Sequence, residues 1–400
     1  MNHKLDLKKQ LACIYTSSFF SGLRITDAVW VALLAARGFS LWEIGLAESV
    51  YHVVSLLCEV PSGMAADLLG RKKTLVTGGV LVVLSHLLMA FAPDLFLICA
   101  AMGLQALSNT MFSGTSAALT YDSLKQDGQE ERYLSVSANC SQIGMLASAL
   151  GSLASTLKRF LRFSGFYLVS ALFEGVSTLA NVLLEEPVVT EAQASRESHS
   201  LRELPEQFLQ LVRDSAAILY GCPLAAKLIL ADAVISIPCY LTKMFLQQRL
   251  IELGWPTEWL FLPLLLGGAA CVAGTEIARR VHPHSLRRFY LLCALLCGGG
   301  TFLVGMAPAW CGILSMMLVQ GVLEVWLLHA DRQLNDCIPS DQRATIISVD
   351  SMAYSLLMIP ASPLVGAIGD AFGQAGAGLA VLGLLVAGSG SVLLLRPNRS

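Results

Sequence analysis

Residues 59–73 of the chain read EVPSGMAADLLGRKK. The stretch lies between two apolar segments, each long enough to cross a lipid bilayer. Within it, Gly63 and Gly70 lie on either side of Asp67, and three cations follow at 71–73. A short basic connection between apolar segments is typical of the cytoplasmic side of a membrane protein. The stretch therefore predicts a chain that crosses the membrane more than once.

The composition supports this prediction. Apolar residues make up 55% of the chain, charged residues 14%, and the mean hydropathy is +0.63. Soluble domains carry about 25% charged residues, so much of this chain is expected to face lipid. The formal net charge of −2 lacks the basic excess of a nucleic-acid-binding protein. The eleven cysteines form no C-x-x-C pair. Seven lie inside apolar runs, and we interpret these as small buried apolar residues: Cys58, Cys99, Cys140, Cys239, Cys271, Cys293 and Cys297.

Apolar runs of membrane length can be counted directly. A helix needs about 20 apolar residues to cross a bilayer core of roughly 30 Å. The predicted spans are 11–36, 41–62, 75–93, 95–118, 136–157, 164–184, 223–247, 258–279, 288–307, 309–330, 344–366 and 375–395. The polar stretch that follows residue 184 divides these twelve runs six and six. Its later part, 201–212, has the apolar spacing of an amphipathic helix on the membrane surface.

The pattern G-x-x-x-D-x-x-G-R-K, from Gly63 to Lys72, resembles the signature loop of the major facilitator superfamily. Together with the twelve runs, the resemblance implies an all-α integral membrane fold, with twelve transmembrane helices in two pseudo-repeated six-helix halves. We place the N-terminal half at 1–185, a cytoplasmic linker with the amphipathic helix at 186–216, and the C-terminal half at 217–400.

The resemblance also implies a latch on the cytoplasmic side. In the family an acid, the loop arginine and an acid on helix four close that side, roles that fall here on Asp67, Arg71 and Asp122. Gly63 and Gly70 are expected to allow a tight turn and close helix approach, because neither has a Cβ atom. The alternative interpretation is a simple basic anchor with an unimportant acid.

The chain also departs from the family in three places. Helix four lacks the usual arginine, helix five lacks the proline of the antiporter motif, and the second copy of the signature loop has Ala278 where the acid belongs. These departures weaken the expectation of proton antiport but leave the expectation of transport intact.

Charged residues inside apolar runs are the next indication of function. Each costs on the order of 3 kcal/mol to insert, so such residues usually face a cavity or a partner. Arg24 and Asp27 are spaced i,i+3 in the first run, which would place them on one helix face. Glu48 and His52 share a face of the second run, and a histidine, with an unperturbed pKa of about 6.5, suits proton relay. A self-neutralised packing pair and a hydrogen-bonded core histidine are the alternatives.

Further candidates come from the helices that line the cavity in this family, the first, fourth, seventh and tenth. Asp232 on helix seven and Glu324 on helix ten are candidate carboxylates for substrate or protons, and Gln105 and Asn109 on helix four are candidate polar contacts. Glu174 lies on helix six, which is peripheral in the family, and we predict no role for it beyond packing.

The distribution of lysine and arginine predicts the orientation. Most fall on one side when both termini are placed in the cytoplasm, as the positive-inside rule requires. Lys158, Arg159 and Arg162 are the exception, in an outer loop. We expect a multi-pass protein of the plasma (inner) membrane, monomeric in the bilayer.

The functional prediction is a secondary transporter that works by alternating access, not an enzyme. The first hypothesis is export of a small drug-like or metabolite molecule, coupled to protons through Asp27, Asp232 or Glu324. The second is uptake or exchange of a polar or anionic metabolite bound by Arg24, and the third is a membrane scaffold or sensor without transport. No catalytic constellation is recognisable, and we expect no metal, no cofactor and no nucleic-acid partner.

Overall fold

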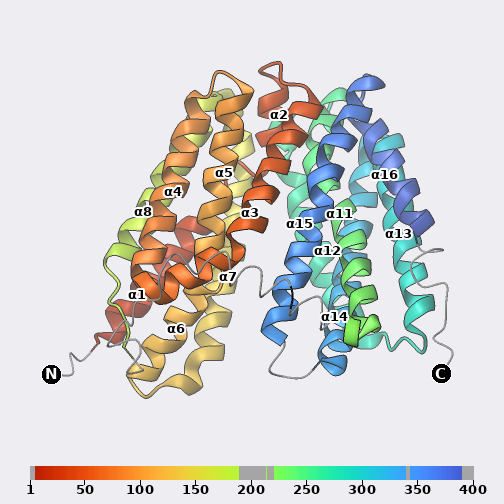
Figure 1. Ribbon diagram of the computed structural model, residues 1–400. Helices are drawn as coiled ribbons and strands as arrows, with labels where there is room; N and C mark the ends of the chain where they lie inside the picture. The colour runs from red at the N-terminus through yellow and green to blue at the C-terminus, as the bar shows by residue number, and fades with distance from the viewer. Residues whose placement is uncertain (1–4, 189–212, 214–219, 339–342, 390–400) are drawn as a thin grey trace. The chain divides into compact units, whose positions relative to one another are not determined.

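The computed structural model describes residues 5–188, 213, 220–338 and 343–389, without the side chains of residues 60, 63–69, 159 and 343–347. Within these ranges every regular element is helical (Figure 1). The predicted amphipathic helix at 201–212 and most of the predicted linker lie outside the described residues. Packing divides the chain into two compact units, 1–27 with 53–208 and 28–52 with 209–400. The predicted N-terminal half thus contributes residues 28–52 to the second unit.

The first unit is a helical bundle. Its helices are α1 (Leu7–Gly22), the later part of α3 (Leu41–Leu69), α4 (Arg71–Phe91), α5 (Leu95–Phe112), α6 (Thr115–Gln126), α7 (Tyr133–Ser152) and α8 (Phe163–Val182), with short 3₁₀ turns at Glu130–Arg132 and Leu153–Arg159. Hydroxyl groups link these helices. The Ser108 hydroxyl donates to the Gly78 carbonyl at 2.7 Å, and the hydroxyls of Ser17 and Ser177 lie 2.9 Å apart. Such small polar contacts hold helices together where water is absent.

The second unit contains α2 (Trp30–Ala35), the first part of α3, α11 (Pro223–Glu252), α12 (Phe261–Arg280), α13 (Leu286–Met306), α14 (Ala309–Cys337), α15 (Arg343–Ala371) and α16 (Ala375–Ser389), with a 3₁₀ turn at Thr257–Trp259. Small residues let its helices approach closely. A Cβ atom added to Gly298 on α13 would lie 2.5 Å from the Gly383 carbonyl oxygen on α16. Close backbone approach through glycine is a common packing mode of transmembrane helices.

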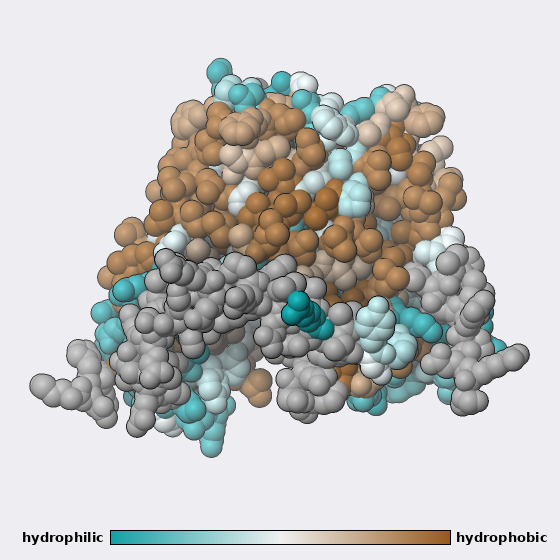
Figure 2. All heavy atoms as spheres, viewed as in Figure 1, coloured by the Kyte–Doolittle hydropathy of each residue, from teal (hydrophilic) through white to brown (hydrophobic). Residues whose placement is uncertain are grey.

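Nine helices within the described residues are long and apolar enough to cross a membrane. The remaining three of the twelve predicted spans correspond to α1 with α2, to α7, and to the shorter apolar helix α16. On the face seen in Figure 2, hydrophobic residues gather in a broad zone and hydrophilic residues lie at its edges. Leu172 and Leu179 on α8 are each more than 60% exposed, as lipid-facing residues would be.

The first predicted span is not one helix. α1 ends at Gly22 and α2 begins at Trp30, and residues between them form turns, with the Asp27 amide donating to the Arg24 carbonyl at 3.2 Å. The prediction that Arg24 and Asp27 share a helix face is therefore wrong. Glycine and the β-branched Ile25 and Thr26 have low helix propensity, which favours a break at this point.

The span predicted at 95–118 is also interrupted. α5 ends at Phe112 and α6 begins at Thr115, with Gly114 at a positive φ of 70°. A positive φ is readily adopted by glycine and strained for residues with a Cβ atom. α6 then continues to Gln126, which extends helical structure well beyond the predicted span.

The signature stretch is mostly helical. α3 runs to Leu69, so Gly63 lies inside a helix and not in a turn, contrary to the prediction. Gly70 alone forms the turn, with φ 94° and ψ 149°. The side chain of Asp67 lies outside the described residues.

Candidate functional site

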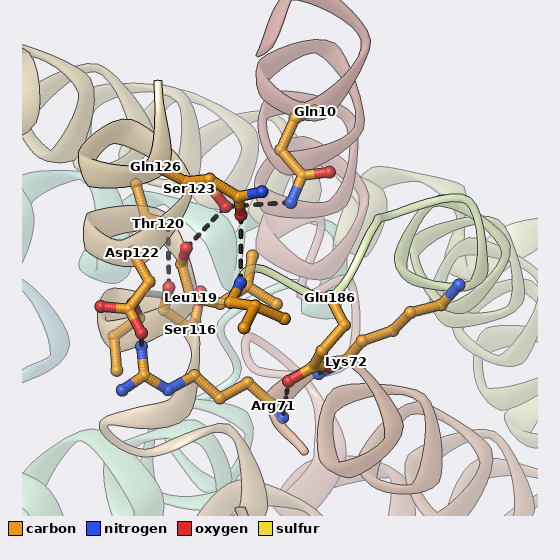
Figure 3. A network of polar contacts seen from close by, with 12 residues as sticks. Gln10, Arg71, Lys72, Ser116, Leu119, Thr120, Asp122, Ser123, Gln126 and Glu186 are labelled. Carbon is orange, nitrogen blue, oxygen red and sulfur yellow. Dashed lines mark hydrogen bonds and ion pairs between the residues drawn. The ribbon is translucent and has the colours of Figure 1, made fainter. Parts of the chain in front are cut away.

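Arg71 is the centre of a polar network in the first unit (Figure 3). Its guanidinium forms an ion pair with the Asp122 carboxylate on α6, and it also donates to the Ala118 carbonyl. The two charged side chains are only 20% and 10% exposed. The structure thus brings together two of the three residues predicted for the latch, and the third, Asp67, lies outside the described side chains.

Glu186 completes the network from the other side. Its carboxylate accepts hydrogen bonds from the backbone amides of Arg71 at 2.8 Å and Lys72 at 2.7 Å (Figure 3). These amides belong to the first turn of α4, where unsatisfied donors and the helix dipole favour an anion. Glu186 was not predicted from the sequence, because a capping acid more than a hundred residues away leaves no local signal.

Gln10 ties the same region to α1. Its side-chain amide donates to the Ser123 hydroxyl and to the Glu185 carbonyl, both at 3.0 Å, and its carbonyl oxygen accepts from the Glu185 amide at 2.9 Å. Gln10 is buried, so these bonds satisfy its polar atoms away from water. We refer to Gln10, Arg71, Asp122, Ser123 and Glu186 as the Arg71 network. It joins α1, α4, α6 and the segment after α8.

A polar cavity of about 300 Å³ lies within the first unit. Side chains from α1, α4, α5, α6, α8 and the turn after α1 line it. Four of the predicted site residues are among them: Arg24, Asp27, Gln105 and Asn109. The backbone break after Gly22 brings Arg24 and Asp27 to the cavity, and α5 brings the side-chain amides of Gln105 and Asn109.

Arg24 and Asp27 are accessible in this cavity. An Arg24 Nη1 atom lies 4.0 Å from an Asp27 carboxylate oxygen, and the side chains are 66% and 51% exposed. An ion pair in such an exposed position contributes little to stability, about 0–1 kcal/mol. The stability of the fold therefore does not explain why Arg24 and Asp27 are present at this position.

Glu174 on α8 also lines the cavity, and the charge of Arg24 acts on it. The prediction that Glu174 serves packing alone does not account for this placement. An acid in an otherwise apolar helix was the available signal, but the face on which it lies cannot be read from such a sequence. The cavity thus holds one cation and two acids, with hydroxyl groups that include Ser17, Ser18, Ser21, Ser116, Thr120 and Ser170.

The other predicted site residues belong to the second unit. Glu48 and His52 lie next to each other on α3, with 3.4 Å between Oε1 and Nε2. Asp232 on α11 accepts a hydrogen bond of 3.0 Å from the Trp326 indole on α14. Glu324 on α14 packs near Gly274 on α12. None of these four residues lines the polar cavity of the first unit.

Membrane-length helices in the described residues, a polar cavity and a buried ion-pair network are features that fit the class of membrane transporters. The chain belongs to the Major Facilitator Superfamily, whose family model matches residues 12–349. The prediction made from the signature stretch is thereby confirmed. The fold is the all-α integral membrane fold of that superfamily, and the chain is a multi-pass membrane protein.

Relatives of known sequence or structure agree. The chain is 21% identical over 369 residues to the uncharacterized MFS-type transporter YxaM of Bacillus subtilis (strain 168), covering 91% of this chain and 90% of that protein. Among solved structures, it is similar to the nucleoside transporter NupG, with a TM-score of 0.71, 14% identity and 98% of each chain covered. It is also similar to a POT family transporter in complex with 5-aminolevulinic acid, with a TM-score of 0.66, 13% identity and 97% and 95% covered. At these identities the structures share the fold alone.

Proposed function

We propose that this transporter carries a small polar solute with both an anionic and a cationic group, bound in the polar cavity of the first unit. The observation that carries the proposal is the shared lining: one arginine and two acids face the same space of about 300 Å³. Ligand sites of small molecules start at about this volume. The cavity therefore suits a solute the size of an amino acid or a small peptide.

The chemistry of the lining assigns a role to each charge. Arg24 presents a planar fork of donors that suits a carboxylate, and Asp27 and Glu174 are acceptors for an ammonium group. Gln105 and Asn109 donate and accept hydrogen bonds through their amides. Each charge-assisted hydrogen bond contributes about 1.5–3 kcal/mol when water is excluded, enough to distinguish a zwitterion from a neutral analogue.

This lining supports the second sequence-based hypothesis, a polar metabolite, over the first, export of drug-like molecules. A drug-like amphipathic molecule needs extended apolar and aromatic contact, whereas hydroxyls, amides and charges dominate here. Among the structurally similar transporters, NupG is a nucleoside transporter, and a POT family transporter is seen in complex with 5-aminolevulinic acid or a conjugated peptide. All of these solutes are polar. Export differs from uptake only in the sign of the gradients, because a secondary transporter is reversible.

Alternating access would expose the cavity to the two sides in turn. The Arg71 network then acts as the cytoplasmic latch, with Asp67 as its third charged member by family resemblance. We also propose that the transporter is monomeric in the plasma membrane, with both termini in the cytoplasm, and that a proton gradient drives accumulation. The acids Asp27, Asp232 and Glu324 are the candidates for proton coupling that the sequence suggested.

Counterflow in proteoliposomes tests the solute class. Purified protein is reconstituted with a high internal concentration of one candidate, and entry of the labelled candidate is followed at equal pH on both sides. The panel contains amino acids, dipeptides, nucleosides and cationic drugs. Counterflow of an amino acid or dipeptide supports the proposal, counterflow of the drugs alone supports drug export, and a silent panel supports the scaffold hypothesis.

A further inference from the structure

His86 on α4 is a buried histidine that the proposed solute contacts do not include. Its side chain lines the polar cavity of the first unit and is only 8% exposed. The His86 Nδ1 atom lies 2.9 Å from the Val82 carbonyl oxygen in the same helix. Because a carbonyl oxygen only accepts, Nδ1 carries the proton of this hydrogen bond. Nε2 is therefore the ring nitrogen without a hydrogen-bond partner among the described residues.

Ser170 on α8 is a second polar residue of the cavity lining without a partner. It is 5% exposed, and its hydroxyl has no hydrogen-bond partner among the described residues. Buried hydroxyls are normally bonded, as Ser85 is when it donates to the Ala101 carbonyl at 2.8 Å. The packing of the first unit thus satisfies the Ser85 hydroxyl and leaves the Ser170 hydroxyl unpaired.

Helices α4 and α8 pack side by side and antiparallel in the first unit. A Cβ atom added to Gly79 of α4 would lie 2.3 Å from Thr178 Oγ1 of α8. Further along, the Ser164 hydroxyl of α8 donates to the Ala90 carbonyl of α4 at 2.6 Å. The two unpartnered residues each lie between these contacts on their own helix. They therefore belong to the same stretch of the helix pair.

One helical turn separates Ser170 from the cavity acid Glu174. The His86 ring lies 6.0 Å from the Tyr167 ring of α8, centroid to centroid. Ser170 follows Tyr167 by three residues and precedes Glu174 by four, a spacing that puts all three on one face of α8. Neighbouring side chains on such a face are about 5–6 Å apart. We refer to His86 Nε2 and the Ser170 hydroxyl as the His86–Ser170 subsite.

The subsite offers hydrogen bonds rather than a fixed charge. Imidazole Nε2 accepts when the ring is neutral and donates when it is protonated, and a serine hydroxyl does both. A hydroxyl or a primary amide also donates and accepts, so it pairs with the subsite in either protonation state. An apolar group would leave both members unpaired away from water. A site of this kind strongly disfavours the analogue that lacks the polar group.

We propose that the His86–Ser170 subsite binds an uncharged hydroxyl or amide of the solute, and that it makes the transporter selective for small zwitterions with such a group. Serine, asparagine and glutamine as free amino acids have this chemistry. The charges around Arg24 and Glu174 hold the zwitterionic end, and the subsite, about 5–6 Å further along α8, binds the side chain. The inference rests on the proposed function and narrows its solute class.

Counterflow of two amino acids of similar shape tests the selectivity. Free asparagine and free leucine are near isosteres that differ in the side-chain amide, and the wild-type KM for asparagine should be lower by about tenfold or more. His86→Phe, which keeps a ring against Tyr167, and Ser170→Ala should each raise the asparagine KM by about tenfold. Both should leave the leucine KM nearly unchanged. His86→Gln, whose amide can replace Nε2, should keep part of the preference.

Ser85→Ala is the matched control for these variants. Ser85 precedes His86 on α4 but is not among the residues that line the cavity, so both KM values should stay at the wild-type level. Equal wild-type KM values for asparagine and leucine would overturn the subsite and leave the zwitterion site standing. An unchanged asparagine KM in His86→Phe and Ser170→Ala would also overturn it. Absence of counterflow for every amino acid and dipeptide would instead overturn the proposed function.

Thermal unfolding tests the unpaired hydroxyl without any solute. Ser85→Ala removes a hydroxyl that is bonded to the Ala101 carbonyl, and it should lower the unfolding temperature. Ser170→Ala removes a hydroxyl without a partner, and it should leave the unfolding temperature unchanged or raise it, because alanine favours the helix. Both serines are buried inside helices, so the change in helix propensity is the same. An equal decrease in the two variants would mean that the Ser170 hydroxyl is bonded within the fold, and would overturn the subsite.

Discussion

Arg71 on α4 and Asp122 on α6 form an ion pair in the first unit, and Arg71 also donates to the Ala118 carbonyl of α6. The pair therefore fixes the start of α4 against α6, next to the point where Glu186 binds the amides of Arg71 and Lys72. Because both charges are largely buried, neither is satisfied by water if its partner is removed.

This arrangement predicts the effect of single and double substitutions. Arg71→Gln and Asp122→Asn should each lower counterflow and the free energy of unfolding, by roughly 3 kcal/mol for a broken buried pair. The double variant should be no worse than the more damaging single variant, since the lost interaction is the same one. Lys72→Gln is the control, because it removes an adjacent charge outside the pair. Additive losses in the double variant would exclude the pairing as the cause.

The family resemblance assigns Asp67 to the same latch. Asp67→Asn should therefore reduce counterflow without loss of folded protein. The measurement is the initial counterflow rate per folded protein, with the unfolding temperature as the check on folding. Unchanged transport would contradict the latch.

The charges of the cavity predict a specific change in solute preference. Arg24→Gln should raise the KM for a solute with a free carboxylate by about tenfold or more, as expected for loss of a charge-assisted hydrogen bond. It should leave the KM for the matching amide nearly unchanged. Asp27→Asn and Glu174→Gln should raise the KM for a solute with a free ammonium group by a similar factor. They should leave the KM for an analogue that lacks this group nearly unchanged. If Glu174 only packed against its neighbours, Glu174→Gln would not discriminate between the two solutes.

The sequence predicted the family and most of the spans for physical reasons. Membrane helices must bury about 20 apolar residues each, so hydropathy alone locates them. The order and spacing of Gly63, Asp67, Gly70 and Arg71 identified the superfamily, and with it Asp122 as a partner of Arg71. Backbone breaks are different: hydropathy is the same for a helix and a turn, so the break after Gly22 and the turn at Gly114 were not predicted.

The site was predicted only in part. Arg24, Asp27, Gln105 and Asn109 were found because polar residues are rare in apolar runs, and they share one cavity. Glu174 was recognised but not placed, because a helix that is apolar all round gives no periodicity to orient it. Gln10 and Glu186 were missed, since their partners lie more than a hundred residues away in the chain.

Gly70 and Gly144 predict opposite effects of the same substitution. Gly70 adopts φ 94° and ψ 149°, where a residue with a Cβ atom is strained by about 1–3 kcal/mol. Gly144 lies in α7, and a Cβ atom added there meets nothing within 4 Å. Gly70→Ala should therefore lower the unfolding temperature. Gly144→Ala should leave it unchanged or raise it, because alanine favours the helix by about 1 kcal/mol. Equal effects of the two substitutions would contradict the assigned turn.

Asp370 predicts how firmly the first part of α3 is held. Its two carboxylate oxygens accept from the amides of Leu41 at 3.0 Å and Trp42 at 2.8 Å, which are the first two residues of α3. Asp370→Asn removes the negative charge at this helix N-terminus and should cost about 1 kcal/mol. Amide hydrogen exchange should consequently increase across Leu41–His52, the part of α3 that belongs to the second unit.

Asp94→Asn is the matched control for this experiment. Asp94 caps α5 by accepting from the Leu97 amide at 2.9 Å, so it stabilises a helix N-terminus within its own chain segment only. Its substitution should increase exchange at the start of α5 and leave Leu41–His52 unchanged. If Asp370→Asn left exchange in Leu41–His52 at the wild-type rate, the cap would not be what holds α3 to α15. The close approach of Gly45 to Ser362 and the hydrogen bond from Ser49 to the Ile359 carbonyl would then be the contacts that hold the two helices together.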